Sequence, residues 1–254
     1  MVYKWSVTLP KLTGSEPRNA YVYVPQACLD DPTLRCPVLY MFDGHNLFDD
    51  GDATYGKSWG LDEYLDFTQT PLIVAAIECN HSPNNGRLSE YAPFDYNDPI
   101  CGPIHGQGKL TMDWIVKVFK PMVDRRFPTL PGRKHTFIGG SSMGGLMSLY
   151  ALTKYNFAFS RAAILSPSLW THPENIQRLI AGARLRPGTV AYMDYGSEEM
   201  ANHPGMDRQF RAVTDQLLSK GVMLNSRIVP GGDHSEASWE RQLPFFLSTL
   251  LYGL

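Results

Sequence analysis

The sequence predicts a mostly parallel, doubly wound α/β sheet with an antiparallel N-terminal edge. Strand-like and helix-like segments alternate along all 254 residues, which is typical of a parallel sheet with helices on both faces. Several strand-like segments are continuous apolar runs, as in strands that are buried on both faces. Since no repeat or low-complexity linker interrupts the chain, we expect one domain over residues 1–254.

The first two segments, residues 4–9 and 18–24, alternate along their length and are rich in β-branched and aromatic residues. A period of two is typical of strands with one exposed face. We expect them to form an antiparallel pair at the edge of the sheet, with Pro25 ending the second strand.

The apolar runs at residues 38–42 and 72–77 lack this alternation, so we expect parallel strands with helices on both faces. Residues 111–127 carry apolar side chains at helical spacing, and we expect Pro121 to bend this helix or to end its first half. The later segments continue the alternation, with strands at 135–138, 162–165, 190–195 and 224–229 and helices at 144–154, 174–183, 207–220 and from 236 onward.

Residues 80–109 form a stretch rich in Gly, Pro and Asn that shows no periodicity of its own. A loop of this length in a compact domain is usually functional or disordered, and its aromatic content favours a function. In open α/β sheets, ligands bind at the carboxyl ends of the strands. We therefore expect the chemistry of this protein at that edge of the sheet.

The composition argues against several classes of partner. The formal net charge is −2, the pI is about 6.4, and no run of five like charges is present, which predicts no binding to nucleic acid or to an anionic membrane. The N-terminus lacks the features of a signal peptide, and no run of about 18 apolar residues follows. We expect a cytoplasmic protein with a small-molecule partner, and the oligomeric state stays open.

The four cysteines stand singly, without a C-x-x-C pair, and the chain has no H-E-x-x-H motif. This spacing favours reduced, packed thiols over a zinc site or a redox dithiol. We expect no metal site and no cofactor, so metal chelation should leave the activity of the protein unchanged.

The motif GSSMG at residues 140–144 fits G-x-S-x-G between an apolar strand and an amphipathic helix. In this context the serine lies on a sharp turn that exposes its hydroxyl at the helix N-terminus. Ser142 is the candidate nucleophile, since for Ser141 the second glycine position would fall on Met143. A phosphate-binding loop is disfavoured because no Lys-Ser or Lys-Thr pair follows the glycines. A plain glycine-rich turn is the remaining alternative.

A serine nucleophile needs a base, and in strand-turn-helix sites of this kind the chain order is Ser, acid, His. His234 follows the last apolar strand and is the candidate base, whereas His203 lies in a polar loop. The acid should follow the strand before that one, where Glu198 and Glu199 are both candidates. Asp194 ranks third, because strand alternation could point it the other way.

Acyl transfer also needs two N–H donors for the oxyanion of the tetrahedral intermediate. One is expected from the backbone of Met143, the residue after the nucleophile. The other is expected from the loop DGHN at residues 43–46, where Gly44 lets the backbone approach the substrate and the N–H of His45 is the candidate. A simple Asp-Gly turn is the alternative.

These residues resemble the Putative esterase family of α/β hydrolases. The family includes siderophore esterases of the enterochelin type, feruloyl and acetylxylan esterases, S-formylglutathione hydrolase and the mycolyltransferases. The resemblance runs through most of the chain, and it implies the α/β-hydrolase fold. It rests on DGHNLFD at 43–49, IGGSSMGGLMS at 138–148, SPSLW at 166–170, MDYGSEE at 193–199 and GGDHSEASWERQL at 231–243.

The resemblance also assigns roles to residues. It places the nucleophile on Ser142 and the histidine on His234. The acid, three positions after the glycine of its loop, falls on Glu199. The oxyanion donor after the Asp-Gly of the first motif falls on the N–H of His45.

The function that the resemblance implies is a serine carboxylesterase that hydrolyses a small or aromatic acyl ester through a Ser-His-Glu triad and an acyl-enzyme. Transfer to an alcohol acceptor and a catalytically silent binding member of the fold are the alternatives. The resemblance places Trp59 and Trp170 near the substrate, with core packing as the alternative for each. Arg87 and Glu90 in the long loop could contact a substrate carboxylate or hydroxyl, although we expect such loop charges to be solvated.

Overall fold

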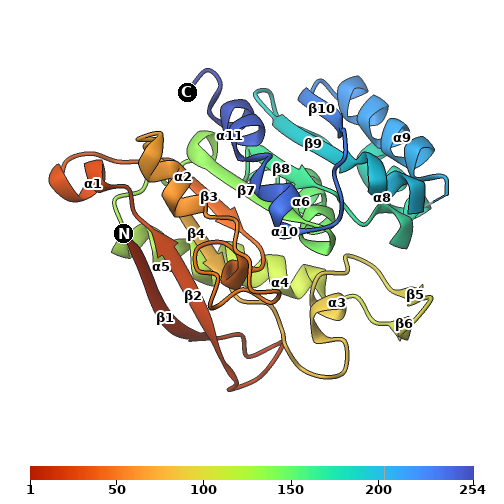
Figure 1. Cartoon of the computed structure of the whole chain (residues 1–254), viewed down its shortest axis with the longest axis horizontal. Coiled ribbons are helices and arrows are strands. Elements are labelled where there is room, and N and C mark those ends of the chain that lie inside the picture. The colour runs from red at the N-terminus through yellow and green to blue at the C-terminus, as the bar shows by residue number, and fades with distance from the viewer. Residues whose placement is uncertain (203) are drawn as a thin grey trace.

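The computed structural model of the chain describes residues 1–202 and 204–254. Its strands span Val2–Thr8 (β1), Pro17–Tyr23 (β2), Val38–Met41 (β3), Ile73–Ile77 (β4), Tyr96–Asp98 (β5), Gly102–Ile104 (β6), Thr136–Ser141 (β7), Arg161–Leu165 (β8), Val190–Gly196 (β9) and Met223–Val229 (β10). The main sheet has the order β1-β2-β4-β3-β7-β8-β9-β10, and β5 and β6 form a separate hairpin. β2 is antiparallel to both β1 and β4, and the other neighbours are parallel. The predicted mostly parallel sheet with an antiparallel N-terminal edge is confirmed (Figure 1).

The α-helices of the described chain connect these strands. They span Gln26–Asp30 (α1), Leu61–Phe67 (α2), Gly86–Glu90 (α3), Gly108–Trp114 (α4), Lys120–Arg126 (α5), Met143–Lys154 (α6), Pro173–Ala181 (α7), Ser197–Asn202 (α8), Met206–Ser219 (α9), Glu236–Glu240 (α10) and Leu243–Leu251 (α11). No helix within the described ranges is both long enough and apolar enough to cross a lipid bilayer.

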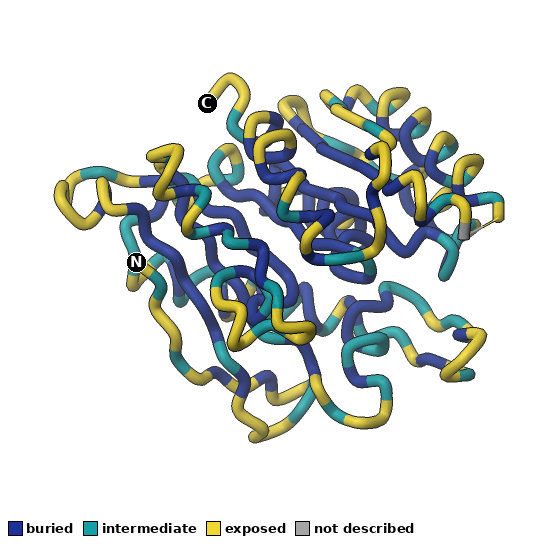
Figure 2. The backbone as a smooth tube through the Cα atoms, viewed as in Figure 1, coloured by how far each residue is buried: buried dark blue, intermediate teal, exposed yellow. Residues whose placement is uncertain are grey.

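The sheet carries a packed core on each face. Along β3, Tyr40 points into the larger apolar cluster, to which α4, α5, α6, α7 and α9 contribute. Its neighbour Leu39 points into a second cluster with α2, α10 and α11. Figure 2 shows the central strands buried along their length. Because helices cover both faces, the central strands are apolar at successive positions, as their sequences predict.

Six strands of the sheet run parallel, so their carboxyl ends meet at one edge. This is the edge where ligand sites form in open α/β sheets. The candidate site residues lie in the segments that directly follow these strands. These segments are residues 43–46 after β3, 79–81 after β4, 142 after β7, 166–168 after β8, 197–199 after β9 and 234 after β10.

Two prolines disturb predicted helices: one at Pro121, where the sequence predicts a bend or a break, and one in the C-terminal helix, where the sequence predicts none. The helix expected over residues 111–127 contains a π-helical turn, Ile115–Phe119, which ends two residues before Pro121. The C-terminal helix divides into α10 and α11, with Pro244 at the start of α11. A proline has no N–H to donate and its ring crowds the preceding turn, so the backbone widens or restarts there.

The segment 80–109 has more regular structure than its sequence indicates. It contains α3, the β5–β6 hairpin and the start of α4. These elements are too short to show a periodicity. Glu90 of α3 is fully buried, and both of its carboxylate oxygens accept from one nitrogen of Arg18 on β2, at 2.8 and 2.7 Å. The expectation of a solvated charge was therefore wrong for Glu90.

Candidate active site

Ser142 lies at the junction of β7 and α6, with φ 59° and ψ −122°. A non-glycine residue is strained in this conformation. The backbone around this turn is packed closely, both within the turn and against the end of β8. A Cβ on Gly140 would lie 3.0 Å from the backbone of Gly144, and a Cβ on Gly145 would lie 2.5 Å from the carbonyl oxygen of Leu165. Gly140 of the motif and the following Gly145 thus let the strand and helix meet at an angle that presents the serine side chain.

Three side chains form one hydrogen-bonded chain at this turn. His234 Nε2 lies 3.0 Å from Ser142 Oγ, and His234 Nδ1 lies 2.6 Å from Glu199 Oε2. Both distances are within the range that a nucleophile, its base and an orienting carboxylate require. The imidazole of His234 also packs edge-on against Trp239, with ring centroids 5.0 Å apart. The structure therefore brings together three residues that lie far apart in the sequence.

The carboxylate of Glu199 is held on its other side as well. Its Oε1 accepts from the Gly196 N–H at 3.0 Å and from the Ser166 hydroxyl at 2.6 Å. The indole N–H of Trp239 donates to Ser166 Oγ at 3.0 Å. These bonds fix the plane of the carboxylate, so that Oε2 faces the imidazole of His234.

The other candidate acids lie elsewhere. Glu198 is exposed. Asp194 is 1% exposed, and its carboxylate accepts from the Tyr192 hydroxyl at 2.8 Å and from the Ser166 N–H at 3.1 Å. Burial raises the pKa of Asp194 to about 7. His203, the alternative base, lies outside the described residues.

The turn that carries the second candidate oxyanion donor is a 3-10 helix, Gly44–Asn46, directly after β3. Asp43 precedes it in the left-handed region, at φ 55° and ψ 50°. Arg87 donates to both carboxylate oxygens of Asp43 at 2.8 Å. Although burial acts in the opposite direction, the guanidinium lowers the pKa of Asp43 below its usual value. This bidentate pair anchors the turn to α3.

The side chain of His45 is buried beneath the same turn and is 4% exposed. Its Nε2 lies 2.9 Å from the Thr54 hydroxyl oxygen. Its Nδ1 is buried and has no hydrogen-bond partner. Burial lowers the pKa of His45, so the ring is neutral near pH 7.

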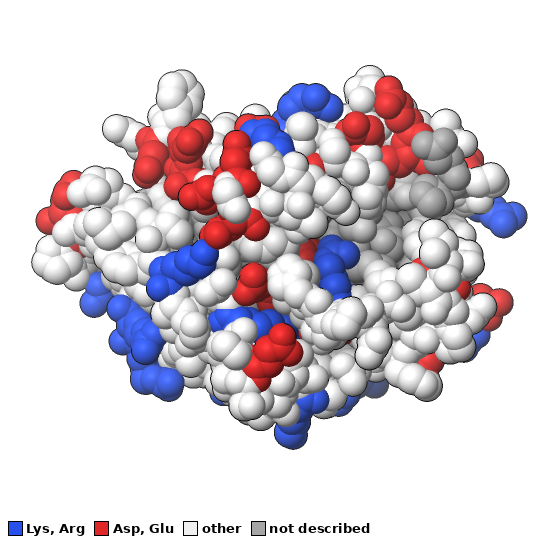
Figure 3. Space-filling model, turned by 60° about the horizontal axis from the view of Figure 1, so that its bottom comes forward, with Lys and Arg blue, Asp and Glu red and all other residues white. Residues whose placement is uncertain are grey.

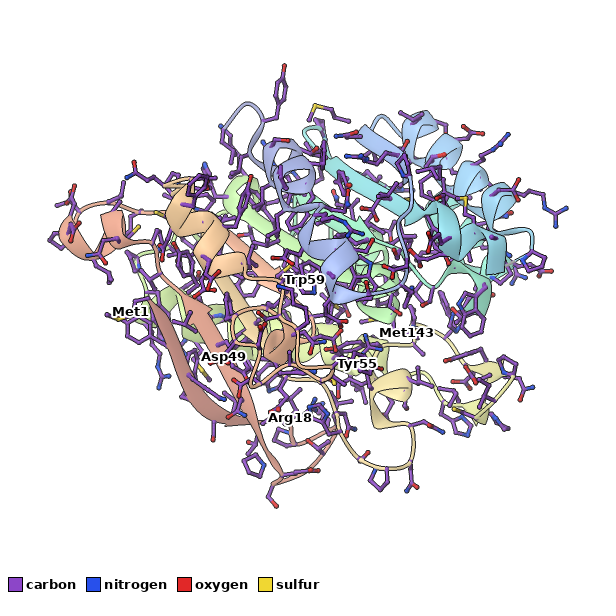
Figure 4. The ribbon with its side chains drawn as sticks, viewed as in Figure 1. Met1, Arg18, Asp49, Tyr55, Trp59 and Met143 are labelled. Atoms are coloured by element: carbon purple, nitrogen blue, oxygen red, sulfur yellow. The ribbon has the colours of Figure 1, made fainter. Side chains whose placement is uncertain are left out.

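A pocket of about 340 Å³ opens beside these groups. Its walls combine polar and apolar side chains, which suits a ligand with both characters. Figure 4 labels Tyr55, which borders the pocket from the loop after β3, and Met143, the residue after the candidate nucleophile. The pocket is lined in part by Asn46, Tyr55, Asn80, Arg87, Ser142 and His234.

A larger apolar groove of about 690 Å³ runs between β1 and the helices α4 and α5. None of the residues that line it is a candidate for catalysis. We therefore place the candidate site in the smaller pocket, which Ser142 and His234 line.

On the face that Figure 3 presents, acidic and basic side chains lie close to one another, in keeping with the small net charge of the chain.

The two predicted pocket tryptophans lie in different surroundings. Trp59 is 2% exposed and packs against Trp239 and Phe246, with ring centroids 6.0 and 6.4 Å apart, beside α10 (Figure 4). The core-packing alternative therefore describes Trp59. Trp170 is partly exposed and meets Tyr96 of the β5–β6 hairpin edge-on, with centroids 6.3 Å apart.

Sequence reasoning missed two serines at the site. Ser166 supports Glu199, and Ser168 Oγ lies 3.5 Å from Ser142 Oγ. Both belong to the SPS motif that follows β8 directly. The rule that function gathers at the carboxyl ends of strands could have identified them.

Solved structures share this architecture. The siderophore hydrolase EstA from Aspergillus nidulans superposes with a TM-score of 0.70 and 22% identity, over 98% of this chain and 95% of that chain. Identity at this level shows a shared fold. The fold is that of the α/β hydrolases, as predicted, and this defines the class of the protein.

The family follows from the sequence comparison. The family model described as "Putative esterase" matches residues 13–249. The chain belongs to this family and is a hydrolase that acts on esters. It is 28% identical to the uncharacterized Bacillus subtilis protein YbbA over 204 residues, 79% of this chain and 76% of YbbA. It is 29% identical to a siderophore triacetylfusarinine C esterase of Aspergillus fumigatus over 138 residues, 53% of this chain and 44% of that enzyme.

Proposed function

We propose that the protein is a serine carboxylesterase that cleaves small or aromatic acyl esters through Ser142, His234 and Glu199. The observation that carries the proposal is the chain of contacts from Ser142 Oγ to His234 Nε2 at 3.0 Å, and from His234 Nδ1 to Glu199 Oε2 at 2.6 Å. A hydroxyl at a strained turn, an imidazole base and a buried carboxylate are the parts that acyl transfer requires.

In the proposed acylation step, His234 Nε2 takes the proton of Ser142 Oγ while the oxygen attacks the ester carbonyl carbon. The carbonyl oxygen becomes an oxyanion, which the backbone N–H groups of Met143 and His45 stabilise. Glu199 stabilises the imidazolium that forms. The proton then passes from His234 to the leaving alkoxide, the carbon–oxygen bond breaks, and the alcohol departs.

Deacylation repeats the proton transfers of the acylation step, with water in place of Ser142 as the nucleophile. His234 takes a proton from water, and the hydroxide attacks the acyl carbon of the acyl-enzyme. The second tetrahedral intermediate collapses, Ser142 regains its proton from the imidazolium, and the carboxylic acid leaves. No metal or cofactor takes part in these proposed steps.

The volume and the lining of the pocket limit the size and chemical class of the proposed substrate. A volume of about 340 Å³ accommodates an acetyl or a single aromatic acyl group with part of its alcohol. The pair with Asp43 engages Nε and Nη2 of Arg87, so we place Nη1 near a polar oxygen of the substrate. The named activity of the Aspergillus fumigatus relative makes siderophore esters one class to test.

The Ser142→Ala variant tests the proposed nucleophile. We expect turnover of p-nitrophenyl acetate to fall by about 10⁶-fold, because the acyl-enzyme can no longer form. A fluorophosphonate probe should label the wild-type chain at Ser142, as read by peptide mass spectrometry. The Ser141→Ala variant is the matched control and should still be labelled. Hydrolysis by Ser142→Ala at the wild-type rate would contradict the proposal, and an unlabelled wild-type chain would identify a silent member of the fold.

A further inference from the structure

Three metal-ligating side chains gather at one wall of the pocket. The ligand atoms of His45, Cys79 and His81 all lie within 4.8 Å of one another. Cys79 Sγ lies 4.0 Å from His81 Nε2, and the two imidazole rings meet edge-on with centroids 4.9 Å apart. All three residues line the same pocket as Ser142. Across residues 1–202 and 204–254, one group of three His, Cys, Asp or Glu side chains has this spacing.

The three side chains offer the kinds of ligand atom that Zn²⁺ prefers. One thiolate and two imidazoles are typical ligands of Zn²⁺, with Zn–S about 2.3 Å and Zn–N about 2.0 Å. Tetrahedral geometry with these bond lengths places the ligand atoms roughly 3.3 to 3.6 Å apart. The side chain of His81 is 52% exposed, and its Nε2 lies 3.3 Å from Glu78 Oε1 at the protein surface. His81 must leave this contact to turn toward the two buried ligands. Three protein ligands leave the fourth position open to the pocket.

The hydrogen bonding of His45 points independently to a ligand. Its Nδ1 is buried without a partner, and a buried, unsatisfied polar atom costs free energy. Its Nε2 lies at hydrogen-bonding distance from the Thr54 hydroxyl. Histidines that bind metals usually have their second nitrogen held in this way, which fixes the ring for coordination.

We propose that Cys79, His81 and Nδ1 of His45 bind one Zn²⁺ ion, and that the bound ion inhibits the esterase. Binding replaces the S–H bond of Cys79 with a Zn–S bond, and the thiol proton passes to solvent. The ion would lie against the turn whose backbone N–H, at His45, we assign to the oxyanion. A substrate carbonyl oxygen would then compete with the ion for the same wall of the pocket. The inhibition rests on the proposed esterase function, whereas the binding does not.

Titration with Co²⁺ tests the binding without reference to activity. We expect the wild-type protein to bind one Co²⁺ per chain and to develop a thiolate-to-cobalt charge-transfer band. Cys79→Ser should abolish this band, and His81→Gln should weaken Zn²⁺ binding by about tenfold or more in calorimetry. Cys101→Ser and His105→Gln change an exposed thiol and an exposed histidine outside the pocket and serve as matched controls. A wild-type chain without the band, or a Cys79→Ser variant that keeps it, would overturn the site.

Inhibition is measured as the Zn²⁺ concentration that halves the rate of p-nitrophenyl acetate hydrolysis, relative to the metal-free rate of the same variant. This concentration should rise by about tenfold or more in Cys79→Ser and in His81→Gln, and a chelator should restore the wild-type rate. Equal inhibition of wild type and both variants would show that the ion acts elsewhere, for example on His234. Ser142→Ala separates the two proposals, since it should bind Co²⁺ normally while lacking turnover.

Discussion

Glu198 and Glu199 are neighbours in the sequence and lie in opposite environments. Both belong to the first turn of α8, where successive side chains point about 100° apart. That rotation leaves Glu198 in solvent and turns Glu199 inward, where it is 4% exposed and contacts His234. At the scale of single residues, the direction of a side chain thus selects between two chemically equal candidates.

The isosteric pair Glu199→Gln and Glu198→Gln tests this difference. We expect kcat to fall by about 10³- to 10⁴-fold in Glu199→Gln, because a neutral amide neither stabilises the imidazolium nor fixes the tautomer of His234. Glu198→Gln should keep kcat within about twofold, because its side chain is solvated. Steady-state kinetics on p-nitrophenyl acetate measures both. A similar loss in the two variants would exclude Glu199 as the specific partner of His234.

Asp194 makes stability depend on pH. The ordinary pKa of this carboxyl group, which applies to the unfolded chain, is 3.8. Burial in the folded protein raises the pKa to about 7. Between these values the folded state binds more protons than the unfolded state, so the free energy of unfolding falls as pH rises. One pKa unit corresponds to about 1.4 kcal/mol, so from pH 4 to pH 7 wild type should lose about 2–4 kcal/mol relative to Asp194→Asn.

Urea unfolding of wild type and Asp194→Asn at a series of pH values measures this difference. The variant keeps the shape of the side chain and removes its titration, so its curve should be flatter across that window. Parallel curves for the two proteins would show that Asp194 does not titrate differently in the folded and unfolded states.

At the scale of elements, the contact between β7, α6 and the end of β8 sets the geometry of the turn at Ser142. Gly145→Ala would bring a Cβ to 2.5 Å from the carbonyl oxygen of Leu165. We expect this overpacking to cost about 2–3 kcal/mol of unfolding free energy and to lower kcat, because the start of α6 must shift. Thermal and urea unfolding together with kinetics measure these effects.

Gly132 offers the matched control for that substitution. Its φ is −70°, and no atom lies within 4 Å of the Cβ that an alanine would add. Gly132→Ala should therefore be neutral or should stabilise the protein by about 0.4–1 kcal/mol, because it restricts the unfolded chain. If both alanine variants had equal stability, the close approach at Gly145 would not be the cause.

Long elements with strong local patterns can be predicted from the sequence, whereas very short elements cannot. The strand at residues 72–77 and the helix at 207–220 carry strong local patterns, and the structure has β4 and α9 there. By contrast, α3 and the β5–β6 hairpin lie in a segment without periodicity. Elements of three to five residues are stabilised by their neighbours more than by their own propensities, so their sequence carries little signal.

At the scale of the whole molecule, we propose that residues 1–254 fold as one domain. Both apolar clusters draw on strands from the two halves of the chain. The buried pair of Arg18 and Glu90 joins residues 72 positions apart, between β2 and α3. These contacts join the two halves of the chain, which supports the proposal of a single domain.

A single domain should unfold in one cooperative transition. Far-ultraviolet circular dichroism, near-ultraviolet circular dichroism and the loss of ester hydrolysis should share one midpoint in urea. Two separated transitions, with the N-terminal strands melting first, would contradict the single-domain proposal.

The sequence alone predicted the alternation of strands and helices, a sharp turn at Ser142, and the chain order of Ser142, an acid at Glu198 or Glu199, and His234. These features are local or ordinal, because they depend on hydrophobic periodicity, on glycine spacing and on position after a strand. The residues alone left Glu198 and Glu199 open, and the resemblance to the family placed the acid on Glu199, which contacts His234 in the structure. Only the tertiary structure decided that Trp59 lies in the core and that Cys79 and His81 lie against His45. Such contacts depend on which strands are neighbours and where each side chain points, and no local pattern encodes either.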